Sequence, residues 1–452
     1  GENTDDNKIQ HISLKQSRFF SLFKIFTINR SDYKRVQQKK LKKYDWLWKV
    51  LVYGSYLDFN LIKRLKEQYP PIKNTISDKN KFVYSTGLHS RSKKLVLSKD
   101  TSAIENIPFV NAKGIDAFFI DYLNTDNIDI EKIDIVKDVR IYQAPMLLIR
   151  KGLNMKNLTA KCSIAEKNII FKDSITSIKP LNDSKSELIN LASIFSSDLF
   201  SYYAINIFAS IGVEREQTQN YNKFSLPYLE LNVNEYVEAI ERAKQDLYEE
   251  KKKTLIDNHK VQELENIINV GLEKINESIY KKLDLDDIER SLINYALEIN
   301  LNLIVGSETS KNNLFTPLAY EDKILKAYAQ LFLNRFQSNL SNKDQKFIVE
   351  IWHTNQIIGM MFKVIPIEEY KEDIKWKDSN QHNNEILSFL TKISSEKITE
   401  KLFVQKDIRG FEKDYFYIFK PNERRFWHKA IGYLDVNEFA DAILKSKKHA
   451  DL

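Results

Sequence analysis

Three successive stretches between Asn234 and Gly306 place apolar residues three and four positions apart. They cover residues 234–255, 261–283 and 284–304. This spacing predicts amphipathic helices, each with one apolar face to bury. This helical run separates a segment before it from a segment after it.

The parts on either side of the helical run show strand patterns mixed with helical ones. Before it, short apolar stretches between residues 80 and 180 predict strands joined by turns. After it, residues 346–354 and 357–367 predict a β-hairpin. The fold class that follows is α+β or mixed α/β, with several domains. We expect a domain with a mixed sheet over residues 1–233, a helical spacer over 234–340 and a small α/β domain over 341–452.

Helices are also expected before the helical run. Asp32 is placed to cap a basic helix, and Asp58 to cap a second helix that continues to Glu67 and stops at Pro70-Pro71. Residues 186–211 predict one or two amphipathic helices.

A Leu-Pro pair separates the aromatic-rich part of the chain from the helical run. Leu226-Pro227 follows a polar stretch, residues 214–223. Proline lacks a backbone donor and disfavours helix at the residue before it. We therefore expect the globular part to end at this pair, with the polar stretch as a surface loop.

Positive charge is concentrated in the first quarter of the chain. Residues 1–113 hold 23 Lys and Arg against 10 Asp and Glu, a net charge of +13. Residues 114–234 carry −2 and residues 235–452 carry −4, which leaves +7 overall. A concentrated basic face is the usual footprint of a polyanion, most often a nucleic acid. The alternative is a solvated, lysine-rich surface without a ligand.

The sequence holds no recognisable catalytic or metal-binding motif. Its 11 glycines never form G-x-G, the pattern of phosphate-binding loops. No G-x-S-x-G is present, and the 7 histidines show no zinc spacing. We therefore expect no catalytic residue, no metal ligand and no cofactor in this chain. One alternative stays open, a metal-dependent nuclease subunit that would use Asp373 in the triplet Asp373-Ile374-Lys375.

The composition bounds the class of protein. Hydrophobic residues make up 42% of the chain, enough for several cores, and no apolar run reaches the ~18 residues that span a membrane. Cys162 is the only cysteine, which excludes a disulfide framework and suits a reducing cytosol. We expect a cytoplasmic protein with no membrane partner.

Several segments resemble the target-recognition region of type II restriction–modification adenine-N6 DNA methyltransferases. Trp48–Lys66 (WKVLVYGSYLDFNLIKRLK) is similar to the entry into that region. Residues 143–152 (QAPMLLIRKG), followed by a strand, then by a helix over residues 191–210 and a Leu-Pro exit, are similar to the same region. Residues 275–297 are similar to the helical segment that follows, and residues 420–443 to a C-terminal extension. A recognition domain, a Leu-Pro exit and a long helix also resemble the specificity subunits of multi-subunit restriction enzymes.

The resemblance implies that residues 1–233 form a DNA target-recognition domain and that double-stranded DNA is the partner. It implies S-adenosylmethionine for the parent protein, but the family's motif, an Asp, Asn or Ser before Pro-Pro and an aromatic residue, is missing. The only Pro-Pro lies in Tyr69-Pro70-Pro71-Ile72. Because the chain begins with Gly1-Glu2-Asn3 and no Met, we expect the catalytic half in an upstream methyltransferase domain or subunit. A protein-interaction scaffold of a defence complex stays an alternative.

Basic residues in the first third of the chain are candidates for phosphate contacts. Lysine and arginine neutralise phosphates and position a duplex without reading its sequence. The candidates are Lys34, Arg35, Lys39, Lys40, Lys42 and Lys43 after Asp32, and Arg150 and Lys151 at a strand end. Arg91, Lys93 and Lys94 lie in a turn between strands, where a loop that enters a DNA groove would be. For each group the alternative is a solvated surface or turn.

Polar residues before the Leu-Pro pair are candidates for base readout. Arginine pairs with guanine, and glutamine or asparagine with adenine. The candidates are Arg215, Gln217, Gln219 and Asn220. The alternative is an ordinary surface loop.

Overall fold

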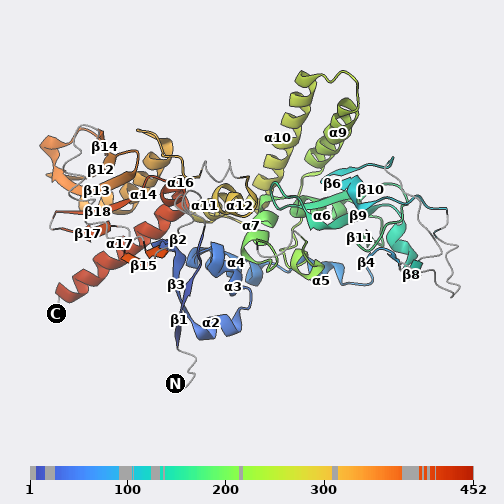
Figure 1. Cartoon of the computed structure of the whole chain (residues 1–452), viewed down its shortest axis with the longest axis horizontal. Coiled ribbons are helices and arrows are strands. Elements are labelled where there is room, and N and C mark those ends of the chain that lie inside the picture. Colours follow the sequence, from blue (N-terminus) through green and yellow to red (C-terminus); the bar gives the residue numbers. More distant parts are fainter. Residues whose placement is uncertain are drawn as a thin grey trace. The chain divides into compact units, whose positions relative to one another are not determined.

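The computed structural model describes residues 7–15, 26–90, 104, 106–123, 133–135, 138–212, 217–307, 314–378, 396–399, 402–404, 408–412 and 414–450. The chain forms two compact units. The inserted unit is Phe59–Asp286, and the split unit combines Gly1–Asp58 with Asp287–Leu452. The fold class is mixed α+β, as predicted (Figure 1). The predicted domains 1–233, 234–340 and 341–452 stay a prediction, and the compact units are divided elsewhere, after Asp58 and after Asp286.

The inserted unit contains a four-stranded sheet. Its strand order is β10 (Ala160–Ala165), β9 (Met146–Leu153), β11 (Ile175–Pro180) and β4 (Phe82–Thr86). Each strand pair is antiparallel, whereas the sequence predicted a mixed sheet here. Residues 146–149 of β9 are fully buried, because this central strand is covered on both faces.

One helix packs on this sheet, and a second helix follows it. α6 (Lys185–Phe195) contacts β9, β10 and β11 and lies beside them in Figure 1. α7 (Asp198–Asn206) follows it, and its residues from Leu199 to Asn206 are all buried. The predicted helices therefore form, but α7 is not amphipathic. The physical reason is that α6 and α7 also pack against the two long helices that follow, so their outer sides are covered as well.

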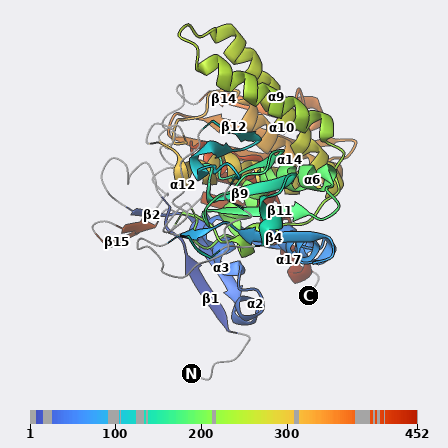
Figure 2. The ribbon, with the colours of Figure 1, turned by 90° about the vertical axis from the view of Figure 1, so that its right-hand side faces the viewer.

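The predicted helical run is confirmed over all three stretches, the third of which forms α11 (Asp287–Tyr295), the π-helix η5 (Ala296–Asn300) and α12 (Leu301–Val305). α9 (Asn234–Lys251) and α10 (Asn258–Lys282) pack side by side as a helical hairpin (Figure 2). Gly271 of α10 permits the close approach, since a Cβ there would lie 2.7 Å from the Cγ1 of Ile240 in α9. The remaining elements of the inserted unit are α5 (Ile72–Ile76), β5 (His89–Ser90), η2 (Ala112–Gly114), β6 (Ile115–Asp116), β7 (Phe119–Ile120), β8 (Ile133–Ile135), η4 (Val139–Tyr142) and α8 (Asn220–Lys223).

The split unit contains a five-stranded sheet. Its strand order is β14 (Ile374–Asp378), β12 (Gln345–His353), β13 (Ile357–Pro366), β18 (Tyr415–Pro421) and β17 (Ile408–Phe411). β12 and β13 form the predicted antiparallel hairpin. β14 runs parallel to β12, so this sheet is the mixed one.

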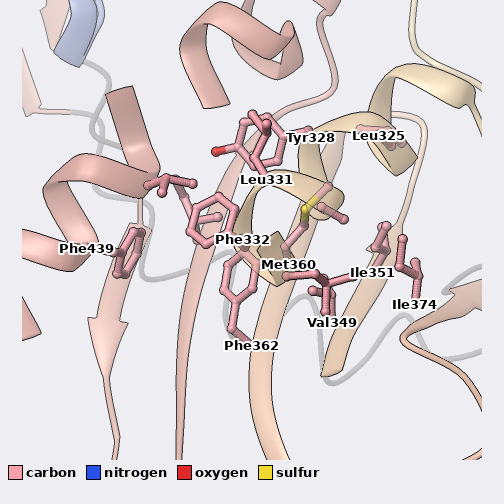
Figure 3. Packing of buried hydrophobic residues seen from close by; sticks show 14 of the residues in the cluster. Leu325, Tyr328, Leu331, Phe332, Val349, Ile351, Met360, Phe362, Ile374 and Phe439 are labelled. Carbon is pink, nitrogen blue, oxygen red and sulfur yellow. The ribbon is translucent and has the colours of Figure 1, made fainter. Parts of the chain in front are cut away.

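An aromatic core joins this sheet to α14 (Lys323–Leu340) and α17 (Lys429–Ala450) (Figure 3). Phe332 of α14 stacks on Phe362 of β13, with ring centroids 4.0 Å apart. The ring of Phe439 in α17 lies 5.8 Å from that of Phe332. Removing these rings from water is the main source of stability in this part of the unit.

The N-terminal part of the split unit corrects one prediction. Residues 33–43 do not form one helix capped by Asp32. β3 (Tyr33–Gln37) pairs with β1 (Lys8–Ile12), and only α2 (Gln38–Lys43) is helical. Asp32 is buried, and its carboxylate accepts hydrogen bonds from the backbone N–H of Asn29 (2.8 Å) and from Lys15 Nζ (3.2 Å). Pairing with β1, which lies well before it in the chain, overrides the local helical pattern.

The next helix is confirmed with a different cap. α4 (Tyr56–Gln68) begins after Ser55, whose Oγ accepts the N–H of Leu57 at 3.2 Å. Asp58 lies inside the first turn, and its Oδ2 accepts the N–H of Ser55 at 2.7 Å. Ser55 and Asp58 thus satisfy two backbone donors reciprocally, as in a capping box.

The split unit has further short elements. They are β2 (Phe26–Ile28), η1 (Arg30–Asp32), α3 (Leu47–Tyr53), α11 (Asp287–Tyr295), the π-helix η5 (Ala296–Asn300), α12 (Leu301–Val305), η6 (Ile367–Glu369), β15 (Glu396–Thr399), β16 (Leu402–Val404) and α16 (Arg424–Trp427). Within the described ranges, no helix has both the length and the apolar character needed to cross a bilayer.

Candidate nucleic-acid interface

The structure places the candidate residues in two regions, one in each unit. The basic arm consists of β1, β3 and α2 in the split unit. The polar turn is the segment Gln217–Lys223 in the inserted unit, which adjoins the end of β9.

The basic arm concentrates cations without carboxylates. Residues 33–43 contain six lysines and arginines and no Asp or Glu. In α2 only Leu41 is buried, and the lysines are exposed. At about 100° per residue, the four lysines spread over an arc of about 160° opposite Leu41. The exposed lysines are Lys39, Lys40, Lys42 and Lys43.

The strand before α2 separates its two cations. Arg35 is exposed, whereas Lys34 is half-buried and faces α3. The Nζ of Lys34 donates to the carbonyl oxygen of Leu51 at 2.5 Å. Burial, reinforced by the charge of Lys15, lowers the pKa of Lys34 to about 7. Lys34 therefore holds the strand to α3, and Arg35 is the cation of the strand that faces solvent.

The polar turn lies against the end of β9. Gln217 forms an antiparallel bridge with Gly152, and the N–H of Thr218 donates to the carbonyl of Lys151 at 3.3 Å. Exposure then alternates along the segment, because Gln217 and Gln219 are exposed and Thr218 between them is buried. Two groups of candidates that lie far apart in the sequence thus become neighbours in space.

A buried lysine anchors the polar turn. Lys223 in α8 is fully buried, and its Nζ donates to the carbonyl oxygens of Arg150 and Lys151, the latter at 3.3 Å. Burial lowers the pKa of Lys223 to about 7. The Nδ2 of Asn222 also donates to the Oγ1 of Thr218 at 3.1 Å. These contacts fix the turn to the strand end from beneath.

Three candidates already have partners within the unit. The Nη1 of Arg150 donates to the carbonyl of Ile115 at 3.2 Å, and the Nζ of Lys151 lies 3.1 Å from a carboxylate oxygen of Asp173. The Nδ2 of Asn220 donates to the Oγ1 of Thr176 in β11 at 2.9 Å. Gln217 and Gln219 are therefore the outward-facing members of this group, and Asn220 is held against the sheet. Arg91, Lys93, Lys94 and Arg215 lie outside the described residues.

The Leu-Pro pair joins the polar turn to a second proline pair. The carbonyl of Leu226 accepts the N–H of Ile72 at 2.8 Å, and Pro227 bridges Pro71. Leu226 is fully buried. The helix that follows begins at Asn234, so several residues separate the pair from it.

Two residues that the sequence did not single out belong to this region. Tyr221 is 65% exposed next to Asn220, and Lys223 is its anchor. The alternation of exposure over residues 217–221 continues to Tyr221, so a strand-like pattern would have indicated it. Nothing in the sequence marks Lys223, because lysine is almost never fully buried.

The triplet considered for a nuclease has structural contacts. The Oδ1 of Asp373 accepts hydrogen bonds from Gln337 Nε2 (2.6 Å) and Tyr370 Oη (3.2 Å). Across the described ranges, no group of three or more His, Cys, Asp and Glu side chains is placed to hold a metal ion. The nuclease alternative therefore gains no support from these residues, and the expectations about cofactors stay predictions.

Comparison with known proteins adds little. No protein-family model matches the chain, and no curated protein does. A weak structural neighbour is the Type IIL restriction-modification enzyme MmeI in complex with DNA. The likeness has a TM-score of 0.22 and 12% identity, and it covers 38% of this chain and 23% of the enzyme's chain. A likeness this weak carries no argument about fold or function, so the case for DNA rests on the residues of this chain.

Proposed function

We propose that this chain recognises duplex DNA in sequence-specific fashion as the recognition portion of a restriction–modification adenine-N6 methyltransferase. A catalytic domain or subunit outside this chain would transfer the methyl group from S-adenosylmethionine. The observation that carries the DNA proposal is the basic arm, which has five exposed lysines and arginines and no carboxylate over residues 33–43. The methyltransferase part rests on the sequence resemblance.

The two regions would divide the work. The lysines of α2 would contact phosphates, which supply most of the affinity at low salt. Gln217 and Gln219 would contact base edges, where glutamine pairs with adenine. Contacts of the first kind act on every duplex, and contacts of the second kind distinguish one duplex from another.

The salt dependence of duplex binding tests this proposal. The test variant changes Lys39, Lys40, Lys42 and Lys43 to Glu. Each neutralised phosphate contributes about −0.9 to the slope of log K against log salt, so losing four contacts flattens the slope by up to about 3.6. Binding to all duplexes is expected to weaken alike.

A second quadruple variant controls for net charge. It changes four exposed lysines of the inserted unit to Glu, namely Lys260, Lys274, Lys281 and Lys282. Both variants lower the formal net charge from +7 to −1. An equal loss of duplex affinity in both variants would show that the basic arm is a solvated surface that does not bind DNA specifically. A wild-type chain without salt-dependent DNA binding would favour the scaffold alternative.

A further inference from the structure

The β1–β3 ribbon of the basic arm has one outer face and one inner face. Strand register places Gln10 directly opposite Arg35, and Ile12 opposite Tyr33. These four side chains are all exposed. Directly opposite residues of an antiparallel pair share a face, about 5 Å apart. The outer face thus carries a guanidinium beside an amide, next to an apolar pair.

The inner face attaches the ribbon to α3. Ile9 and Val36 are half-buried there, and they are paired in register. Next to them, the Oγ of Ser13 donates to the carbonyl of Val52 at 3.0 Å, and Lys34 donates to Leu51. These contacts hold the ribbon from behind and determine which side chains face outward.

The dimensions of the ribbon suit the major groove of B-form DNA. Two strands lie about 4.8 Å apart, and a five-residue strand is about 17 Å long. The major groove is about 12 Å wide and admits a two-stranded ribbon. The deep, narrow major groove of A-form RNA does not. The shape therefore favours duplex DNA over duplex RNA.

We infer that the outer face of this ribbon enters the major groove and that Arg35 and Gln10 contact base edges there. Arg35 would donate two hydrogen bonds to O6 and N7 of a guanine, and Gln10 would pair with N6 and N7 of an adenine. Tyr33 and Ile12 offer apolar contact to a thymine methyl group. The lysines of α2, which follows β3 directly, would contact the flanking phosphates. The inference rests on the proposed function and assigns base readout to the arm as well as to the polar turn.

Selection of the full-length chain on a pool of randomised DNA duplexes tests the inference. The key variant is Arg35→Lys, which keeps the charge but loses the two-pronged donor that guanine requires. We expect it to lose the preference at one or two base pairs, by about 5- to 140-fold, while the salt dependence of binding stays as in the wild type. Gln10→Ala is expected to lose the preference at a neighbouring base pair.

Lys43→Ala is the matched control, since Lys43 is exposed on α2 of the same arm. It should weaken binding to all duplexes and leave the selected sequence unchanged. Thermal unfolding of each variant shows whether the arm still folds. If Arg35→Lys and Gln10→Ala select the wild-type sequence, the ribbon does not read bases and the inference is wrong, whereas phosphate binding by the arm survives. If the wild-type chain selects no sequence and binds no duplex, the proposed function fails with it.

Discussion

The basic arm and the polar turn display polar side chains in different ways. In α2 of the basic arm, four lysines extend from a helix in which Leu41 alone is buried. In the polar turn, exposed glutamines alternate with a buried threonine, and a fully buried lysine holds the segment to β9. α2 therefore displays several charges and buries one residue, whereas the turn displays few charges and has several hydrogen bonds beneath it.

Under the proposed function, this difference would correspond to two kinds of contact with DNA. An ammonium group acts on a phosphate as a point charge, so a long, mobile side chain is sufficient. Base readout depends on donors and acceptors held in one geometry, which requires supporting contacts beneath them. The anchored turn and the pinned β1–β3 ribbon meet that requirement, and the exposed lysines of α2 do not need to.

The largest expected effect comes from reversing the buried charge of the polar turn. In Lys223→Glu, a carboxylate would face the carbonyl oxygens of Arg150 and Lys151 without a partner. We expect the free energy of unfolding of the inserted unit to fall by about 3–5 kcal/mol. The same reversal at exposed Lys43 in the basic arm should change stability by less than about 0.5 kcal/mol.

The tryptophans make this effect measurable in one unit at a time. All of them lie in the split unit, so their fluorescence follows that unit, while circular dichroism follows the whole chain. Lys223→Glu should shift the dichroism transition in urea and leave the fluorescence transition in place. If both transitions stay at the wild-type urea concentration, Lys223 is not an anchor. The tryptophans are Trp46, Trp48, Trp352, Trp376 and Trp427.

A smaller effect is expected from pH, and it compares one buried lysine in each unit. Burial lowers the pKa of Lys223 from its usual 10.5 to about 7, so above pH 7 the unfolded chain binds more protons at this site than the folded chain. Burying the charged ammonium of Lys223 destabilises the folded chain fully below pH 7. As pH rises from 7 toward 10.5, the free energy of unfolding increases by up to about 1.4 kcal/mol per pH unit. Lys34, whose pKa is also about 7, has the same sign in the split unit.

Methionine variants isolate these two contributions. Lys223→Met should remove part of the pH dependence from the dichroism transition, and Lys34→Met from the fluorescence transition. Unfolding in urea between pH 6 and pH 9 measures both. A variant whose stability keeps the wild-type pH dependence would show that its lysine titrates normally in the folded chain.

The smallest effect concerns the outward-facing side chains of the polar turn. Gln219→Ala should cost about 1–3 kcal/mol of binding free energy on the preferred duplex and little on others, because base contacts carry discrimination. Asn220→Ala is the control, since Asn220 hydrogen-bonds to Thr176. It should lower stability by about 1 kcal/mol and leave the base preference unchanged. Titration of each variant with the preferred duplex and with a scrambled duplex measures these effects. An equal loss of affinity for both duplexes in Gln219→Ala would show that Gln219 does not read bases.

The spacing of apolar residues within one segment predicted the helices and hairpins that form within that segment. The alternation over residues 346–354 and 357–367 predicted the hairpin of β12 and β13, and the three- and four-residue spacing predicted α9 and α10. β3 was missed because its partner β1 lies on the far side of a long connection, and its basic residues resemble a solvated helix.

The anchors of the candidate interface could not be predicted from the sequence. Lysine is usually a surface residue, and Lys223 and Lys34 are buried because carbonyl groups of β9 and α3 accept their hydrogen bonds. The division after Asp58 and Asp286 depends on contacts between distant segments, such as the parallel pairing of β2 with β16. Spacing within one segment does not encode such contacts.

That division has a consequence for the order of folding during synthesis. The split unit joins its two segments through contacts such as the ion pair of Arg30 with Glu438 and the hydrogen bond from Asn437 to Tyr56. At 5–20 residues per second, the ribosome needs about 8–33 s to translate residues 287–452. The inserted unit is contiguous and can fold within that time. The ribbon and α3 lie within the N-terminal segment and can pair during this interval. The contacts of that segment with residues 287–452 form only after those residues have been translated.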